Sequence, residues 1–280
     1  MRSIFKVQYL ICSLLLICSF INVQSIAANI EDKDDKKDKK ISKDRQEFLK
    51  KLDKVTADQI AELVIFAYGG RGEFTAIRNN GIEEGTIKLF TEDKEVEGKL
   101  IRKFIRNDGV GESRTRVDVD LPSQKLTFGY NGYTVWAARD GFNFTPSPEA
   151  ENSFMASLIH NHDALLRYKE QEATVEKVGL ETIVGIETIV LDLTHRNGSK
   201  TRYYISLKTY HILHLEYEIQ LTAEATPTKF KESFFDFRPV QNTLVPTKTI
   251  LYENGKPIQE IKLTQIKYHT KLNEDEFLKY

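Results

Sequence analysis

The sequence predicts a mainly β, α+β fold: a long antiparallel sheet with one solvated and one apolar face, against which two helices pack. Most of the chain beyond residue 80 alternates apolar and polar residues with the period of two that is typical of half-buried strands. Turn-forming pairs separate these segments, because Asn-Gly and Asp-Gly tolerate the positive φ of tight hairpins. The pairs are Asp108-Gly109, Asn131-Gly132, Asp140-Gly141, Asn197-Gly198 and Asn254-Gly255.

Residues 1–28 predict a cleaved secretory signal peptide. A basic start, MRSIFK, precedes an apolar run and then small residues, and we place cleavage near Ala27 or Ala28. Two alternatives are an uncleaved anchor, because the uncharged stretch is long enough to span a bilayer, and a lipid anchor on Cys18. Residues 29–45 contain EDKDDKKDKKISKDR, which is too charged to bury apolar surface, and they predict a flexible tether. Residues 46–280 are expected to form a single domain.

Composition limits the possible classes of function. Hydrophobic residues make up 40% of the chain and charged residues 29%, a mixture typical of soluble globular proteins. The 40 Lys and Arg residues nearly balance the 41 Asp and Glu residues, so the net charge does not favour nucleic acid as a partner. Both cysteines, Cys12 and Cys18, lie in the predicted signal peptide. The mature domain is therefore expected to fold without disulfides or zinc-thiolate sites.

Two amphipathic helices are expected. The first carries a capping box formed by Thr56 and Gln59, and it ends at Gly69-Gly70. The second spans about 148–168, and its apolar stripe consists of Phe154, Met155, Leu158, Ile159, Leu165 and Leu166. His162 lies within this stripe, so we expect its imidazole to need a hydrogen-bond partner.

The strands give the sheet a wet and a dry face. In RTRVDVDL, residues 114–121, the charged side chains face one way, while Val117 and Val119 face the other. In DLTHRNGSKTRYYISL, residues 192–207, two strands fold about Asn197-Gly198. The apolar side chains that share one face there are Leu193, Tyr203, Ile205 and Leu207. Such a face needs either a covering layer or an apolar ligand.

Candidate catalytic and metal-binding patterns have simpler structural explanations. The run HNHD at 160–163 contains two histidines, but on a helix they point about 200° apart and do not converge on one ion. Asp118 and Asp120 share a strand face with two arginines, which predicts a solvated charge ladder. We therefore expect no enzyme activity, no cofactor and no metal.

Three segments resemble the LolA/LolB-like outer-membrane lipoprotein-sorting proteins of Gram-negative bacteria. They are the helix end AYGG with Phe74 and Ile77 beyond it, residues 179–218 from GLETIVGIE to HLEYE, and residues 234–277 from FFDFRPV to NEDEF. The resemblance implies a strongly curved, incomplete antiparallel β-barrel, whose helices cover a concave apolar face that shelters acyl chains. It also implies a periplasmic carrier or binder of lipidated protein or other lipid, with transport partners at the inner or outer membrane. The alternative is a non-enzymatic envelope protein-interaction or sensing module on the same fold.

The candidate ligand-binding residues are apolar side chains expected on the concave face and on the second helix. From the strands they are Val117, Val119, Phe128, Trp136, Phe142, Phe144, Leu191, Leu193, Tyr203, Ile205 and Leu215. From the helix they are Phe154, Leu158, His162 and Leu165. Aromatic residues around a turn, such as Trp136, are typical of a core but also of a wall that binds a greasy ligand.

Overall fold

The computed structural model describes residues 45, 47, 50, 52–91, 94–106 and 113–278. The chain divides into two compact units, Met1–Lys54 and Val55–Tyr280, and every element described below belongs to the second. The predicted signal peptide, all of the predicted tether except Arg45, and the Asp108-Gly109 pair lie outside the described residues. None of the helices in the described ranges is long and apolar enough to cross a bilayer.

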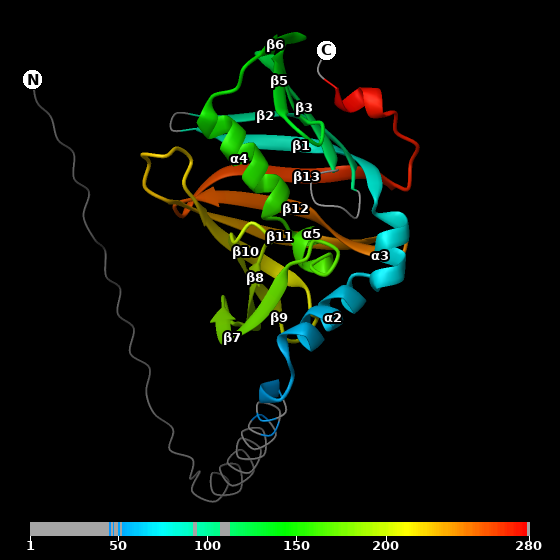
Figure 1. Cartoon of the computed structure of the whole chain (residues 1–280), viewed down its shortest axis with the longest axis vertical. Helices are drawn as coiled ribbons and strands as arrows, with labels where there is room; N and C mark the ends of the chain where they lie inside the picture. Colours follow the sequence, from blue (N-terminus) through cyan, green and yellow to red (C-terminus); the bar gives the residue numbers. More distant parts are fainter. Residues whose placement is uncertain are drawn as a thin grey trace, which may run out of the picture. The chain divides into compact units, whose positions relative to one another are not determined.

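One antiparallel sheet of 13 strands dominates the described part of the second unit (Figure 1). Its spatial order is β6-β5-β4-β3-β2-β1-β13-β12-β11-β10-β9-β8-β7, so two meanders meet where β1 pairs with β13. The strands of the first meander are β1 Asn80–Phe90, β2 Glu95–Ile105, β3 Arg114–Leu121, β4 Gln124–Tyr130, β5 Val135–Arg139 and β6 Phe142–Phe144. Those of the second are β7 Thr174–Ile183, β8 Ile186–Thr194, β9 Lys200–Ser206, β10 Ile212–Ile219, β11 Thr228–Val240, β12 Thr243–Glu253 and β13 Lys256–Tyr268. The sheet is curved and β6 does not pair with β7, which confirms the predicted incomplete barrel.

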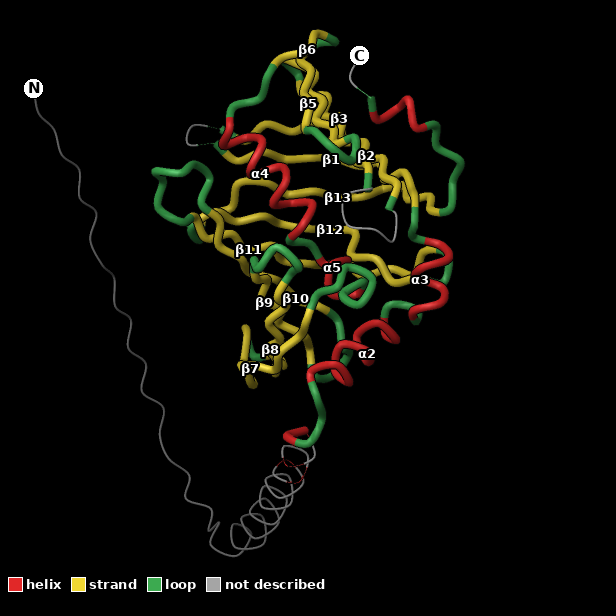
Figure 2. Tube along the Cα trace, in the orientation of Figure 1, coloured by secondary structure: helices red, strands yellow, loops and turns green. Residues whose placement is uncertain are grey.

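The helices lie over one face of this sheet, which we call the inner face (Figure 2). They are α2 Ala57–Ala67, α3 Arg71–Ile77, α4 Pro148–Ile159 and α5 His162–Leu166. A short 3-10 helix, η1 Glu274–Phe277, follows the last strand.

The first helix agrees with its predicted ends. Thr56 and Gln59 form the capping box in both directions, and α2 is followed by Gly69, whose φ of 115° is in the left-handed region. The second helix was expected to be continuous from 148 to 168, and this prediction is wrong. The chain leaves the helical conformation at His160, and the Asn161 side chain accepts a hydrogen bond from the Ala164 amide to start α5. Asparagine favours the N-cap over the helix interior, and this preference outweighs the apolar periodicity here.

The four predicted turn pairs in the described ranges all lie between consecutive strands, but only two of them form two-residue turns. At Asn131-Gly132 and Asn197-Gly198 only the glycine has a positive φ, of 96° and 84°, and the connecting loops are longer. Asp140-Gly141 joins β5 to β6 with φ values of 51° and 84°, and Asn254-Gly255 joins β12 to β13 with 47° and 82°. Both pairs have the two positive φ angles that a two-residue type I′ turn requires. Two further hairpins use Val184-Gly185 and Gln241-Asn242 at similar angles. Neither pair was among the predicted turns.

The outer face of the sheet is charged. Arg116 pairs with Asp118 at 2.9 Å, which confirms the charge ladder expected in RTRVDVDL. Arg202 on β9 pairs with Asp192 on β8 at 2.7 Å in the same manner. The functional question therefore concerns the inner face, where strands and helices meet.

Candidate functional site

A single row of side chains crosses the inner face of the first meander. Strand register aligns these residues from β1 to β6, and they are Glu83, Arg102, Val117, Phe128, Ala137 and Phe144. Residues directly opposite each other on paired strands project from the same face. The row is charged on β1 and β2 and apolar from β3 to β6.

The apolar part of the row belongs to a larger surface, which we call the apolar wall. It comprises Val117, Val119, Leu126, Phe128 and Phe144, and all five side chains are only partly buried. The α4 residue Phe154 lies against Phe128 with ring centroids 5.6 Å apart, and Phe144 meets the same ring edge-on at 6.4 Å. Leu158, also on α4, is likewise half-buried. The wall thus retains accessible apolar surface beside α4.

The other end of the inner face is sealed. Tyr203 on β9 is fully buried, and its hydroxyl donates to the Asn161 carbonyl oxygen between α4 and α5 at 2.8 Å. The predicted site residues that are 0% exposed in this region are Leu165, Leu191, Leu193, Tyr203, Ile205 and Leu215. These side chains form the core between α5 and β8–β10. They have no surface on which a ligand could lie.

Trp136 and Phe142 differ in position from the rest of the predicted set. Trp136 projects from the outer face, where its ring covers Gly129 and its Nε1 donates to the Phe277 carbonyl oxygen at 2.9 Å. Phe142 follows the β5–β6 turn and is 80% exposed. The face on which Trp136 lies could have been predicted from the turn. In a two-residue hairpin about Asp140-Gly141, Ala137 pairs with Phe144, so Trp136 projects from the opposite face.

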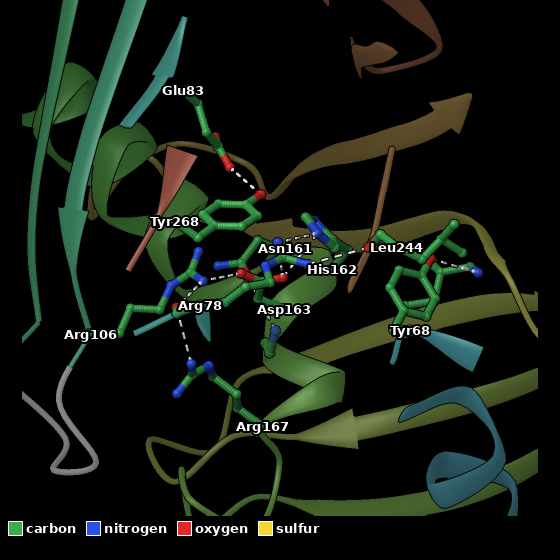
Figure 3. Close-up of polar contacts among 12 residues, drawn as sticks. Tyr68, Arg78, Glu83, Arg106, Asn161, His162, Asp163, Arg167, Leu244 and Tyr268 are labelled. Carbon is green, nitrogen blue, oxygen red and sulfur yellow. Dashed lines mark hydrogen bonds and ion pairs between the residues drawn. The ribbon is translucent and has the colours of Figure 1, made fainter. Parts of the chain in front are cut away.

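The charged part of the row extends into a buried group that we call the inner charged cluster. Its members are Arg78, Glu83, Arg106, Asp163 and Arg167, which Figure 3 shows, together with Arg102, which pairs with Glu83. The Asp163 carboxylate lies at its centre, where it accepts a hydrogen bond from Arg78 Nη2 at 2.9 Å and forms an ion pair with Arg106. Arg167 Nη2 donates to the Arg78 carbonyl oxygen at 3.1 Å. Charged side chains are rarely buried without partners, so this cluster is a defined structural feature.

The second pair in the cluster joins β1 to β2. Arg102 Nε donates to Glu83 Oε2 at 2.7 Å, and the Tyr268 hydroxyl donates to Glu83 Oε1 at 3.0 Å. Burial raises the pKa of Glu83, but the facing Arg102 guanidinium more than offsets this, so its pKa is lower than usual. Asp163 behaves in the same way, with a pKa held well below its ordinary range by Arg106 and Arg78 despite burial. Both carboxylates are therefore ionised at neutral pH.

The two ion pairs of the cluster are accessible only on the arginine side. The side chains of Arg102 and Arg106 are 37% and 25% accessible, whereas those of Glu83 and Asp163 are 3% accessible. A ligand that approaches the cluster therefore meets the arginine side chains first. Glu232 on β11 is partly buried, and burial raises its pKa to about 7.

The histidines of HNHD have separate structural roles. His162 Nε2 lies 2.9 Å from Asp163 Oδ1, so this imidazole has the polar partner that its position required. His160 Nδ1 and His195 Nε2 both contact the Thr201 hydroxyl, each at 2.7 Å. Among the residues that the structure describes, no group of three or more His, Cys, Asp and Glu side chains could hold a metal ion.

The inner charged cluster is the feature that sequence reasoning missed. Arg78 and Asp163 are 85 positions apart, and no local pattern distinguishes them from the many solvated charges of the chain. One partial signal was available in Arg102, which alternates onto the same face as Leu100 and Phe104 on β2.

Comparison with known proteins gives the fold a wider context. No protein-family profile matches the sequence, and no curated protein matches it. Among solved structures, a DUF1329 family protein from Desulfovibrio piger superposes with a TM-score of 0.52 at 14% identity, covering 80% of this chain and 97% of that one. A putative outer membrane lipoprotein-sorting protein domain from Vibrio parahaemolyticus gives 0.51 at 13% identity, covering 78% and 94%. The LolA superfamily protein NE2245 from Nitrosomonas europaea gives 0.51 at 14% identity, covering 80% and 98%. Likeness at this level of identity concerns the fold, and it confirms the predicted LolA-like half-barrel.

Proposed function

We propose that this protein is a non-enzymatic binder or carrier of acyl chains, acting on lipidated protein or on lipid. The observation that carries the proposal is the apolar wall, which faces α4 inside a LolA-like half-barrel and keeps accessible surface on every member. A domain of this size has enough apolar residues to seal such a face, as it does around Leu191 and Tyr203. An unsealed apolar surface within the same fold is typical of a ligand-binding site.

The chemistry of acyl chains explains why such a surface is useful. Each methylene removed from water contributes about 0.8 kcal/mol, so a long acyl chain does not cross an aqueous compartment unaided. We infer that the protein is exported to the periplasm by the signal peptide of residues 1–28, and that it exchanges its cargo with inner- or outer-membrane transport partners. Intact mass of the protein recovered from the periplasm tests the export step, since cleavage near Ala27 or Ala28 removes a defined mass.

The central test compares two substitutions that place the same charge on opposite faces of neighbouring strands. Val117→Glu introduces a carboxylate into the apolar wall, whereas Ile101→Glu introduces it on the outer face of β2, where Ile101 is 37% exposed. Organic extracts of the purified proteins are analysed by mass spectrometry, and binding of the neutral dye Nile red is titrated. We expect Val117→Glu to lose bound lipid and to weaken dye binding at least tenfold, because a carboxylate there, facing Arg102 on the next strand, replaces apolar surface of the wall with a charged group that an acyl chain or a neutral dye would have to desolvate.

The control decides how that loss is interpreted. Ile101→Glu is expected to retain both lipid and dye, and circular dichroism must show that both variants are folded. If folded Val117→Glu protein binds the dye as well as the wild type does, the apolar wall is not the binding surface. Equal losses in the two variants would point to a general effect of added negative charge.

A second candidate function has its own observation. The edge strand β7 and its hairpin carry several accessible apolar side chains, namely Val178, Leu180, Val184 and Ile186. An exposed edge of this type is suited to pairing with another protein. As a protein-interaction or sensing module, the chain would copurify with a stoichiometric partner and without lipid.

A further inference from the structure

We propose that the inner charged cluster binds the anionic headgroup of an amphiphile whose acyl chain lies along the apolar wall. The inference rests on the proposed function, and it adds the chemical class of the ligand: a carboxylate or phosphate headgroup joined to an apolar chain. The juxtaposition that carries it is the inner row, in which Arg102 on β2 is directly opposite Val117 on β3.

The dimensions of the row fit such a ligand. Neighbouring strands lie about 4.8 Å apart, so the four strand steps from Arg102 on β2 to Phe144 on β6 cover about 19 Å. The hydrocarbon core of a bilayer is about 30 Å thick, so the acyl chains of one leaflet extend over about 15 Å. An acyl chain of that length whose headgroup lies at Arg102 therefore covers about three of the four strand steps, so it lies along the wall without passing beyond β6.

The charge of the cluster favours an anion. The cluster contains four guanidiniums, on Arg78, Arg102, Arg106 and Arg167, and two ionised carboxylates, which leaves an excess of two positive charges among these six groups. The carboxylates are sealed, while the accessible side chains are Arg102 and Arg106. An incoming headgroup thus meets arginine side chains, and the planar fork of a guanidinium suits carboxylate and phosphate oxygens.

Two buried guanidinium groups also retain hydrogen-bonding capacity. Arg78 and Arg167 are 1% and 3% exposed, and the Nε of each has no hydrogen-bond partner in the structure. Buried donors of this kind are uncommon, because leaving one unsatisfied lowers the stability of the fold. The positive charges of Arg78 and Arg167 add to the electrostatic field of the cluster, although Arg102 and Arg106 are the groups that touch the ligand.

Glu232 is a partly buried carboxyl that interacts electrostatically with Arg102 and Asp163 of the cluster. Burial raises its pKa to about 7, so at neutral pH it is neutral in a large fraction of molecules. In its neutral form this carboxyl donates a hydrogen bond to an anion instead of repelling it. Glu232 is therefore compatible with an anionic headgroup.

The experiment separates the headgroup from the chain. Lauric acid, lauryl phosphate and lauramide each contain twelve carbons in a straight chain and differ in headgroup charge, and each is used to displace Nile red from the purified protein. We expect the acid and the phosphate to displace the dye at about tenfold lower concentration than the amide, because charge-assisted hydrogen bonds are stronger than neutral ones. The order of the acid and the phosphate identifies which headgroup the site prefers, and either order supports the inference.

The matched variants locate the effect. Glu83→Gln/Arg102→Met removes the cation together with its counter-ion, so no charge is left buried alone, and the Tyr268 hydroxyl keeps its acceptor. Arg202→Met removes a guanidinium from the outer face as the control. We expect the preference for anions to disappear in the double variant and to persist in the control.

The outcomes distinguish this inference from the proposed function. Equal displacement by all three compounds in the wild type, or a preference that survives in the double variant, overturns the headgroup site while leaving acyl-chain binding intact. If no compound displaces the dye, or the dye itself does not bind, the proposed function fails and the headgroup site fails with it.

Discussion

Asp163→Asn removes a single negative charge from the point where two guanidiniums converge. The Asp163 side chain is 3% accessible, it contacts Arg78 Nη2 at 2.9 Å, and it forms an ion pair with Arg106. Removing one partner of a buried pair leaves the other charge uncompensated, which typically costs about 3–5 kcal/mol. In a domain of this size, each kcal/mol lowers the melting temperature by about 2–4 °C, so we expect a fall of roughly 6–20 °C.

Urea unfolding, followed by circular dichroism, measures the effect as a free energy. The control is Asp192→Asn, which breaks the outer-face pair with Arg202, where the arginine is 41% exposed. We expect that change to cost about 0–1 kcal/mol, because solvent screens the pair. Adding Arg106→Met to Asp163→Asn should recover part of the lost stability, since it removes an unpaired cation. If Asp163→Asn costs no more than the control, the cluster is not a buried ionic network.

Three further predictions follow from other parts of the domain. Burial lowers the pKa of His160 to about 3 and that of His195 to about 4, so both imidazoles are neutral in the folded protein and take up protons on unfolding at acid pH. We therefore expect the free energy of unfolding, measured by urea titration, to fall below pH 6.5 by up to about 1.4 kcal/mol per pH unit for each histidine. The variant His160→Gln should reduce that slope. Gly129→Ala places a methyl group about 2.2 Å from the Trp136 ring, so we expect a loss of about 1–3 kcal/mol and a changed tryptophan emission, whereas unchanged emission would show that the ring lies elsewhere. Leu158→Glu on α4 should weaken Nile red binding without unfolding the sheet, and undiminished binding would separate α4 from the ligand site.

The sheet and the first helix could be predicted because their signals are local. The Thr56 and Gln59 capping box and the Asn254-Gly255 turn depend on residues close together in sequence, and both were found where expected. The break between α4 and α5 was missed because the apolar stripe continues through it, while Asn161 caps a new helix inside that stripe. Periodicity alone does not register a competing cap.

The candidate site could be predicted only in part, because alternation assigns a residue to a face and not to a depth. Val117 and Leu191 both belong to apolar strand faces, but one remains partly exposed on the wall and the other is 0% exposed in the core. The difference depends on where α5 lies, which is set by contacts such as that between Asp163 and Arg78. Pairings over such separations in sequence require the three-dimensional structure.

The order of the strands has a mechanical consequence. The first and last strands of the domain pair at the middle of the sheet, so the free edges β6 and β7 are consecutive in sequence. The single segment between them carries α4 and α5 from one edge to the other across the inner face (Figure 1). It therefore acts as a crossbar: the two edges move apart only if this segment stretches or its helices shift. A single proteolytic cut between α4 and α5 would leave two fragments, each of which contains one meander. The hydrogen bonds between β1 and β13 and the ion pairs of Arg78 and Arg106 with Asp163 would hold the two fragments together.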